Sequence, residues 1–299
     1  MLLSLVVGLI LGAVASASQS VGWYGLATAF EPVGTLWTNA IRMTVIPLVV
    51  ALLVTGVAAT ADPKRLGRIG SVAVPVFLGL LLAGGAFAVL LAPLSLLALA
   101  LGLGARLGVA AAGALLHYVL TLSAVLLAFT LLLYPVARVF GGVPLGRFAA
   151  AAIPAQAVAF SSRSSLAALP ALVRGARDRL HAPPTATGFA LPLAVSVFRL
   201  NVPIAWVVGA LFLAKLYGVD LDLPQLVGLV VTATLISFSV PGIPSASLFL
   251  LALVLVDLGL PAAGAGLLIA VDAIPDMFKT TVNVTSRLAV ATIAGRSER

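Results

Sequence analysis

The sequence predicts an all-α membrane protein that crosses the bilayer many times. Hydrophobic residues make up 62% of the 299 residues and charged residues only 9%, and the mean hydropathy is +1.22. These values lie far outside those of a soluble domain. Apolar runs long enough to span a bilayer recur along the chain between short Gly, Pro and Arg clusters. Helices fit such runs, whereas a closed barrel would need alternating strands.

The charge and the composition exclude several classes of function. The net charge is +8, but the basic residues are scattered between apolar spans, so we expect no nucleic-acid partner. The chain has no cysteine, and its two histidines, His117 and His181, make a poor ligand set. We therefore expect neither a metal site nor a cofactor.

Four spans are expected in the first half of the chain. They cover residues 2–18, about 32–60, about 69–102 and about 108–139. The first span ends in AVASAS, which is also compatible with a signal peptide, but no positive residue precedes its apolar run. A first transmembrane helix is the preferred interpretation.

Two segments of the second half read as re-entrant helical hairpins. Residues 148–175 form two apolar arms that meet at a Ser and Arg cluster, and residues 224–258 repeat the pattern around ISFSVPGIPSAS. Each arm is too short to span the bilayer. Between the hairpins, a long span over 186–217 is interrupted at FRLNVP. This arrangement is typical of inverted repeats whose broken helices meet at a midplane site.

The last predicted helix, about 262–295, carries a polar face inside an apolar span. At about 100° per residue its six polar residues fall within an arc of roughly 100°. Charges at membrane depth are costly and usually face a protein interior or a substrate path. We therefore expect this face to line a binding site: Asp272, Asp276, Lys279, Thr280, Asn283 and Arg287.

The distribution of basic residues predicts an orientation. With the N-terminus in the cytoplasm, most loop arginines and lysines fall on the inner side, and only Arg106 and Lys215 lie outside. The expected location is thus the cell (inner) membrane, with multiple passes through the lipid bilayer and both termini cytoplasmic.

Four stretches together resemble the dicarboxylate/amino acid:cation symporter family, the glutamate and aspartate transporter homologues. They are AFSSRSSLAALPAL from residue 159, SVPGIPSASLFLLALVL from 239, VDAIPDMFKTTVNVT from 271, and IRMTVIPLVVALLVTGVA followed by DPKRLGRIG. The resemblance covers nearly the whole chain. It implies a glutamate-transporter-like elevator fold, with scaffold helices 1 and 2 in residues 1–68 and a transport domain in residues 69–299.

The resemblance also implies the residues of the site. Ser164 and Ser165 would meet a substrate carboxylate, and Asp276 would meet an amino group. Lys279 sits where an arginine often pairs with a second carboxylate. The full implied substrate set is Arg163, Ser164, Ser165, Val240, Gly242, Pro244, Asp276, Lys279, Thr280 and Asn283, and the set for coupling or charge balance is Asp272, Arg199, Asn201 and Arg287.

The sequence departs from the family at its cation sites and in its scaffold. Two aspartates that bind sodium in coupled members correspond to Leu200 and Arg287. Cations prefer oxygen ligands, so we expect sodium-independent transport. The scaffold is shortened by about two helices that contribute to the family's trimer, so the sequence leaves the formation of a homo-oligomer open.

Charge alone also points to a small organic anion as substrate. Arg42, Arg163, Arg199, Lys279 and Arg287 lie within spans against only Asp272 and Asp276, and Arg and Lys are the natural carboxylate binders. The alternative is a structural role, in which these residues pair with each other or extend their charged ends to the membrane surface. We predict a symporter-type secondary transporter of a dicarboxylate or an acidic amino acid, proton-coupled or uncoupled. The alternatives are an uncoupled anion channel, a non-transporting relic of the family or, least favoured, an intramembrane serine enzyme.

Overall fold

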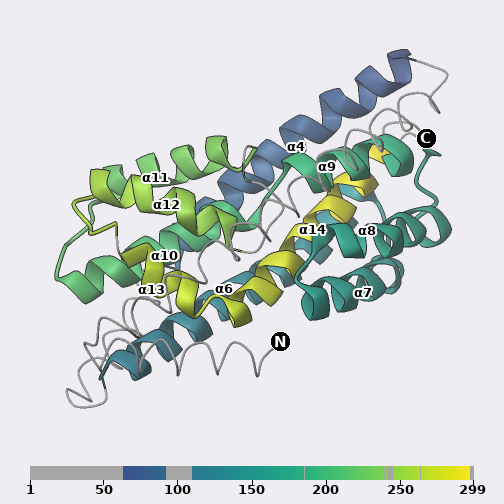
Figure 1. The fold of residues 1–299 in the computed structure, drawn as a ribbon. Coiled ribbons are helices and arrows are strands. Elements are labelled where there is room, and N and C mark those ends of the chain that lie inside the picture. Colours follow the sequence, from purple (N-terminus) through teal and green to yellow (C-terminus); the bar gives the residue numbers. More distant parts are fainter. Residues whose placement is uncertain are drawn as a thin grey trace, which may run out of the picture. The chain divides into compact units, whose positions relative to one another are not determined.

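The computed structural model describes residues 63–91, 110–184, 186–238, 240, 245–262 and 264–296. All of them belong to one compact unit, Val49–Arg299. The first two predicted spans lie outside the described residues, as do Gly242 and Pro244. The described residues form helices and short connections between them, as the sequence predicts for an all-α protein (Figure 1).

Two long helices correspond to the third and fourth predicted spans. Helix α4 covers Pro63–Leu90, and α6 covers Ala110–Gly141. Their stretches Ser71–Leu90 and Gly113–Gly141 are long and apolar enough to cross a membrane. Leu116, Leu120, Leu127 and Leu131 of α6 are all largely exposed, and an exposed leucine surface of this kind fits contact with lipid.

The first predicted hairpin is two helices that pack against each other. Helix α7 covers Leu145–Ser162, and α8 covers Ser165–Arg174. Helix α8 continues directly into a π-helix, η1, over Gly175–Arg179. A Cβ atom at Gly175 would overlap the carbonyl oxygen of Ala151, so glycine is required for η1 to lie directly on α7.

The predicted broken span is interrupted at the expected place. A π-helix, η2, covers Ala186–Ala190 and leads into α9, Leu191–Val197. Residues 198–200 separate α9 from α10, Asn201–Tyr217. The arms of the second predicted hairpin are α11, Leu223–Ile236, and α12, Ala246–Asp257. Both arms pack against α10.

The last predicted helix, about 262–295, is divided in two. Helix α13 covers Gly264–Ala270, and α14 covers Ala273–Arg296, with a turn at Val271 and Asp272 between them. Helix α14, yellow in Figure 1, contacts α4, α6, α7, α8, α9 and α10. Its apolar residues Val282 and Val290 are consequently as buried as its polar face.

Two hydrophobic clusters surround α14. One draws mainly on α4, α6 and α10 to α12, and it includes the fully buried Trp206. The other joins α7, α8 and α9 to the C-terminal half of α14. Because α14 contributes side chains to both clusters, its residues Asp276, Lys279 and Arg287 are buried inside protein.

A charged candidate site at two helix breaks

The tip of the α7–α8 hairpin has a conformation that leaves helix-end groups accessible. Arg163 ends α7 in the left-handed region (φ 54°), which usually favours glycine. Ser164 then caps α8 by accepting a hydrogen bond from the Ala167 N–H at 3.2 Å. Ser165 is the first residue of α8 and is buried. The N-terminus of α8 therefore lies at the tip, where its N–H groups favour a negative charge.

The hairpin tip lies close to the first turns of α14. The rings of Phe160 in α7 and Phe278 in α14 make an edge-to-face contact at 5.2 Å. Arg163 also interacts electrostatically with the carboxylate of Asp276. The structure thus brings Arg163 together with the acidic start of α14.

The break between α13 and α14 holds a buried ion pair. Lys279 donates a hydrogen bond to Asp272 Oδ1, and both side chains are almost completely buried. Ser245, which precedes α12, donates to the other oxygen, Asp272 Oδ2, at 2.7 Å. Asp272 is therefore paired on both carboxylate oxygens, and the Lys279 ammonium is held by the protein's own acid.

Asp276, one turn along α14, is in a different situation. Its Oδ2 is buried and, among the described residues, has no hydrogen-bond partner. Its carboxylate interacts electrostatically with Arg163, Arg199, Lys279 and Asp272. Thr280 donates its hydroxyl hydrogen to the Asp276 backbone carbonyl at 2.8 Å, which leaves the Asp276 carboxylate oxygen available. A buried acceptor without a donor is unusual and is expected to meet a ligand or water.

Two asparagines join the start of α10 to the middle of α14. The Asn283 side chain accepts a hydrogen bond from the Asn201 N–H at 3.0 Å, and its amide donates to Asn201 Oδ1 at 2.8 Å. This double contact fixes the start of α10 against the middle of α14. Both side chains are buried, so the pair sets the relative position of the elements that carry the charged residues.

The break between α9 and α10 is bordered by two buried arginines. Arg199 donates from Nε to the Val240 carbonyl at 3.2 Å. Arg287, which is fully buried, donates from one Nη to the Phe198 carbonyl at 2.7 Å and to the Val195 carbonyl at 3.4 Å. Its Nε and Nη1 have no hydrogen-bond partner among the described residues. Both guanidinium groups are therefore held by backbone carbonyls.

Leu200, the third residue of this break, is also buried. Its side chain offers no oxygen ligand at the position where the resemblance implied an aspartate in coupled members. The carbonyl ends of α9 instead meet the Arg287 guanidinium, a pairing that the negative end of a helix dipole favours.

Sequence reasoning missed three polar residues. Ser245 was within a recognised segment, but nothing in its sequence position indicated the contact with Asp272. Tyr118 of α6 is fully buried, its hydroxyl has no described partner, and it interacts electrostatically with Asp272. Gln156 of α7 joins Tyr134 at 3.1 Å and Thr285 at 2.8 Å. Polar residues inside apolar spans were the only available signal for these positions.

The arrangement collects an excess of positive charge in a buried place. Three cations, Arg199, Lys279 and Arg287, are buried together with two carboxylates, Asp272 and Asp276. Arg163 adds a fourth, partly buried cation. Burying unbalanced charge is costly, so a bound anion would stabilise this site.

Comparisons with known proteins find a matching family model and several similar proteins. The model of the sodium:dicarboxylate symporter family matches residues 1–92 and 86–297. The mouse excitatory amino acid transporter 3 is 37% identical over 138 residues, which are 46% of this chain and 26% of that protein. The mouse excitatory amino acid transporter 2 is 36% identical over 137 residues, 46% and 24% of the two chains. A putative sodium-dependent excitatory amino acid transporter of Caenorhabditis elegans, glt-4, is 34% identical over 126 residues, 42% and 25% of the two chains. The matched region thus spans about a quarter of the length of these relatives.

Proposed function

This chain belongs to the sodium:dicarboxylate symporter family, and on that premise we propose that it is a secondary transporter of a small organic anion. The family consists of membrane transporters and not of enzymes, so the intramembrane serine enzyme is set aside. The observation that carries the proposal is the net positive, buried cluster where the hairpin tip and the two helix breaks meet.

A carboxylate substrate would neutralise part of the positive charge of this cluster. It would balance charge near Arg163 and Arg199, and it would meet the N-terminal N–H groups of α8. Ser164, Ser165 and Val240 belong to this binding region, and we keep Gly242 and Pro244 as gate residues on the family resemblance alone.

Asp276 favours an acidic amino acid over a plain dicarboxylate. An ammonium group would give the buried Oδ2 the donor that it lacks among the described residues. Lys279 is already paired with Asp272, so it is less available for a second carboxylate than its sequence position implied. All three relatives above are named excitatory amino acid transporters, which agrees with a substrate that has an amino group.

Transport by this chain is proposed to be independent of sodium. In broken transporter helices, carbonyl ends commonly coordinate the coupling cation. In this chain the carbonyls of Val195 and Phe198 accept hydrogen bonds from the Arg287 guanidinium, and the Leu200 side chain is apolar. We propose that Arg287 acts as a fixed cation at this position and that coupling is to protons or absent.

The mechanism is proposed to be of the elevator type. Residues 69–299 would move as the transport domain, and residues 1–68 would supply scaffold helices. The cluster that joins α7, α8 and α9 to α14 supports movement of these elements together. The inner membrane, with both termini cytoplasmic, remains the proposed location, and the oligomeric state is left to measurement.

Uptake into proteoliposomes tests the proposal. Labelled aspartate and succinate would be offered to the purified protein with Na⁺ or choline outside, and with or without a proton gradient. We expect saturable aspartate uptake that does not change when choline replaces Na⁺. Uptake that never saturates would favour the uncoupled channel, and substrate binding without uptake would favour the non-transporting relic. Uptake that requires Na⁺ would overturn the role of Arg287.

A further inference from the structure

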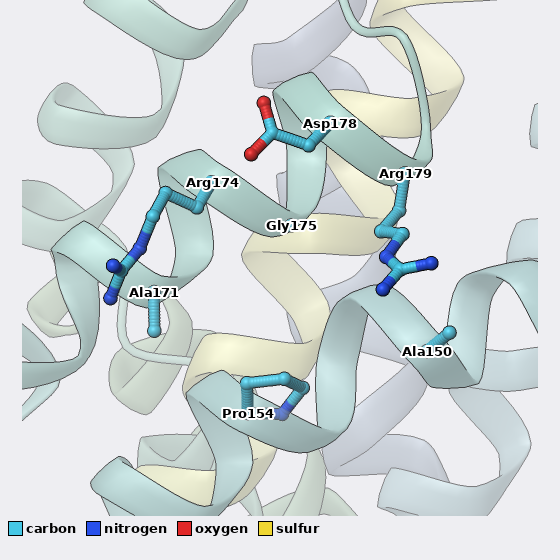
Figure 2. Close-up of a pocket in the computed structure, with 7 residues that line it drawn as sticks. All are labelled: Ala150, Pro154, Ala171, Arg174, Gly175, Asp178 and Arg179. Carbon is cyan, nitrogen blue, oxygen red and sulfur yellow. The ribbon is translucent and has the colours of Figure 1, made fainter.

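A second basic site lies at the open end of the α7–α8 hairpin, away from its tip. A cavity of about 200 Å³ is lined by Ala150, Pro154, Ala171, Arg174, Gly175, Asp178 and Arg179. Figure 2 shows Arg174 and Arg179 on opposite sides of this cavity, with Ala150 and Pro154 of α7 beneath it. It shares no residue with the charged site described above.

The π-helix brings the two arginines to one cavity. In an α-helix, residues five positions apart project about 140° away from each other. In η1 the hydrogen bonding is one residue wider, as in the bond from the Leu180 N–H to the Gly175 carbonyl at 3.3 Å. Arg174 and Arg179 therefore both line the cavity, and the close packing of Gly175 on Ala151 holds η1 in place.

The one acid in the cavity wall is already compensated. Asp178 accepts a hydrogen bond from Arg177 Nε at 2.9 Å, and both side chains are largely exposed. In Figure 2 the Asp178 carboxylate points away from Ala150 and Pro154. Arg174 and Arg179 have no carboxylate partner among the described residues, so the cavity carries a net positive charge.

The rest of the cavity wall is apolar and leads to an exposed apolar surface. Ala150, Pro154 and Ala171 form this wall, and Ile153 beside Pro154 is 56% exposed. Pro154 has no N–H, so it cannot satisfy the Ala150 carbonyl, which is left as an acceptor. Two cations beside an apolar face match an amphiphile with a phosphate, and basic pockets at the cytoplasmic side of membrane helices bind such headgroups. The Ala150 carbonyl could accept a hydrogen bond only from a hydroxyl of the headgroup, not from the phosphate.

We propose that this cavity binds the headgroup of an anionic phospholipid such as phosphatidylglycerol. Arg174 and Arg179 bind the phosphate, and the acyl chains lie along the exposed face of α7 near Ile153. The loop of these arginines is the one that the positive-inside pattern assigns to the cytoplasm.

Native mass spectrometry of the delipidated full-length protein tests the site. Phosphatidylglycerol or phosphatidylcholine would be titrated into wild type, into the double variant Arg174→Gln/Arg179→Gln and into the double variant Arg138→Gln/Arg147→Gln. The second double variant is the matched control, because it also removes two positive charges from exposed residues on the predicted cytoplasmic side, but from residues that do not line the cavity. We expect wild type and Arg138→Gln/Arg147→Gln to retain one phosphatidylglycerol molecule, and Arg174→Gln/Arg179→Gln to bind it about tenfold or more weakly.

Several outcomes would overturn this proposal. Equal retention by Arg174→Gln/Arg179→Gln would show that these arginines do not bind the lipid, and an equal loss in Arg138→Gln/Arg147→Gln would indicate general surface charge. Equal retention of phosphatidylcholine would show that the anionic headgroup is not recognised. Displacement of the lipid by millimolar inorganic phosphate would identify a simple anion site. Thermal melts of all three proteins check folding, and the readout does not depend on transport.

Discussion

The two helix breaks of this protein balance buried charge in different ways. At the α13–α14 break, Asp272 is paired with Lys279 and Ser245, so an acid and a base neutralise each other. At the α9–α10 break, Arg199 and Arg287 are held by backbone carbonyls. The charges at the first break cancel, whereas the second break keeps a net positive charge. The difference suggests that the first break maintains the architecture, whereas the second sets which ions the site accepts.

Removing one partner of the Lys279–Asp272 ion pair should cause the largest loss of stability. Lys279→Met leaves Asp272 buried with Ser245 as its remaining partner, and breaking a buried ion pair costs about 3–5 kcal/mol. We expect thermal unfolding in detergent at a clearly lower temperature than for wild type. The double variant Asp272→Asn/Lys279→Met removes both charges and should recover much of this loss. If the single variant melts like wild type, the pair is not a structural element.

Removing the Arg287 guanidinium should lower the stability of the protein by a smaller amount, and a soluble cation should restore it. Arg287→Ala leaves the carbonyls of Phe198 and Val195 without their donor, at a cost of about 1–3 kcal/mol. We expect millimolar guanidinium to raise the melting temperature of this variant but not that of wild type.

Sodium and choline chloride serve as controls in the same melts. Stabilisation of Arg287→Ala by Na⁺ alone would mean that the carbonyls form a metal-ion site once the side chain is gone. If no cation stabilises the variant, the contrast between the two breaks fails, because Arg287 would then be a packing residue.

A substitution at Asp276 tests whether the substrate carries an ammonium group. Asp276→Asn keeps the shape but removes the charge that would meet an ammonium group. A hydrogen bond to a charged group contributes about 1.5–3 kcal/mol, so aspartate affinity should fall by about 10- to 100-fold while succinate affinity changes less. Competition binding with both ligands measures this difference. An equal fall for both ligands would argue against an amino group at Asp276.

The smallest loss of stability is expected for a substitution at Ser245. Ser245→Ala removes one hydrogen bond to Asp272 but leaves the bond from Lys279, so the loss of stability should be about 1 kcal/mol. A thermal melt beside that of Lys279→Met ranks the two contacts. A larger loss in Ser245→Ala would mean that the hydroxyl, and not the ammonium, is the main partner of Asp272.

Much of the fold was predictable because it depends on local pattern. The positions of α6, α7, α8, α10, α11 and α12 agree closely with predicted arms and spans, since apolar length and Pro or Gly clusters determine where such helices begin and end. The interruption at residues 198–200 was also predicted, and family membership is confirmed by the family match. The roles of the individual site residues and the domain division remain predictions.

The sequence by itself determined that a polar, charged face runs along the last helix and that cations outnumber acids within the apolar spans. Only the tertiary structure decided which charges pair. Along a regular helix Lys279 would be the neighbour of Asp276 three residues before it, but the chain turns at Val271 and Asp272, and Lys279 pairs with Asp272 instead. Likewise, Arg287 reaches carbonyls some 90 residues earlier in the chain. Such contacts depend on how separate helices pack, and periodicity within one helix carries no information about them.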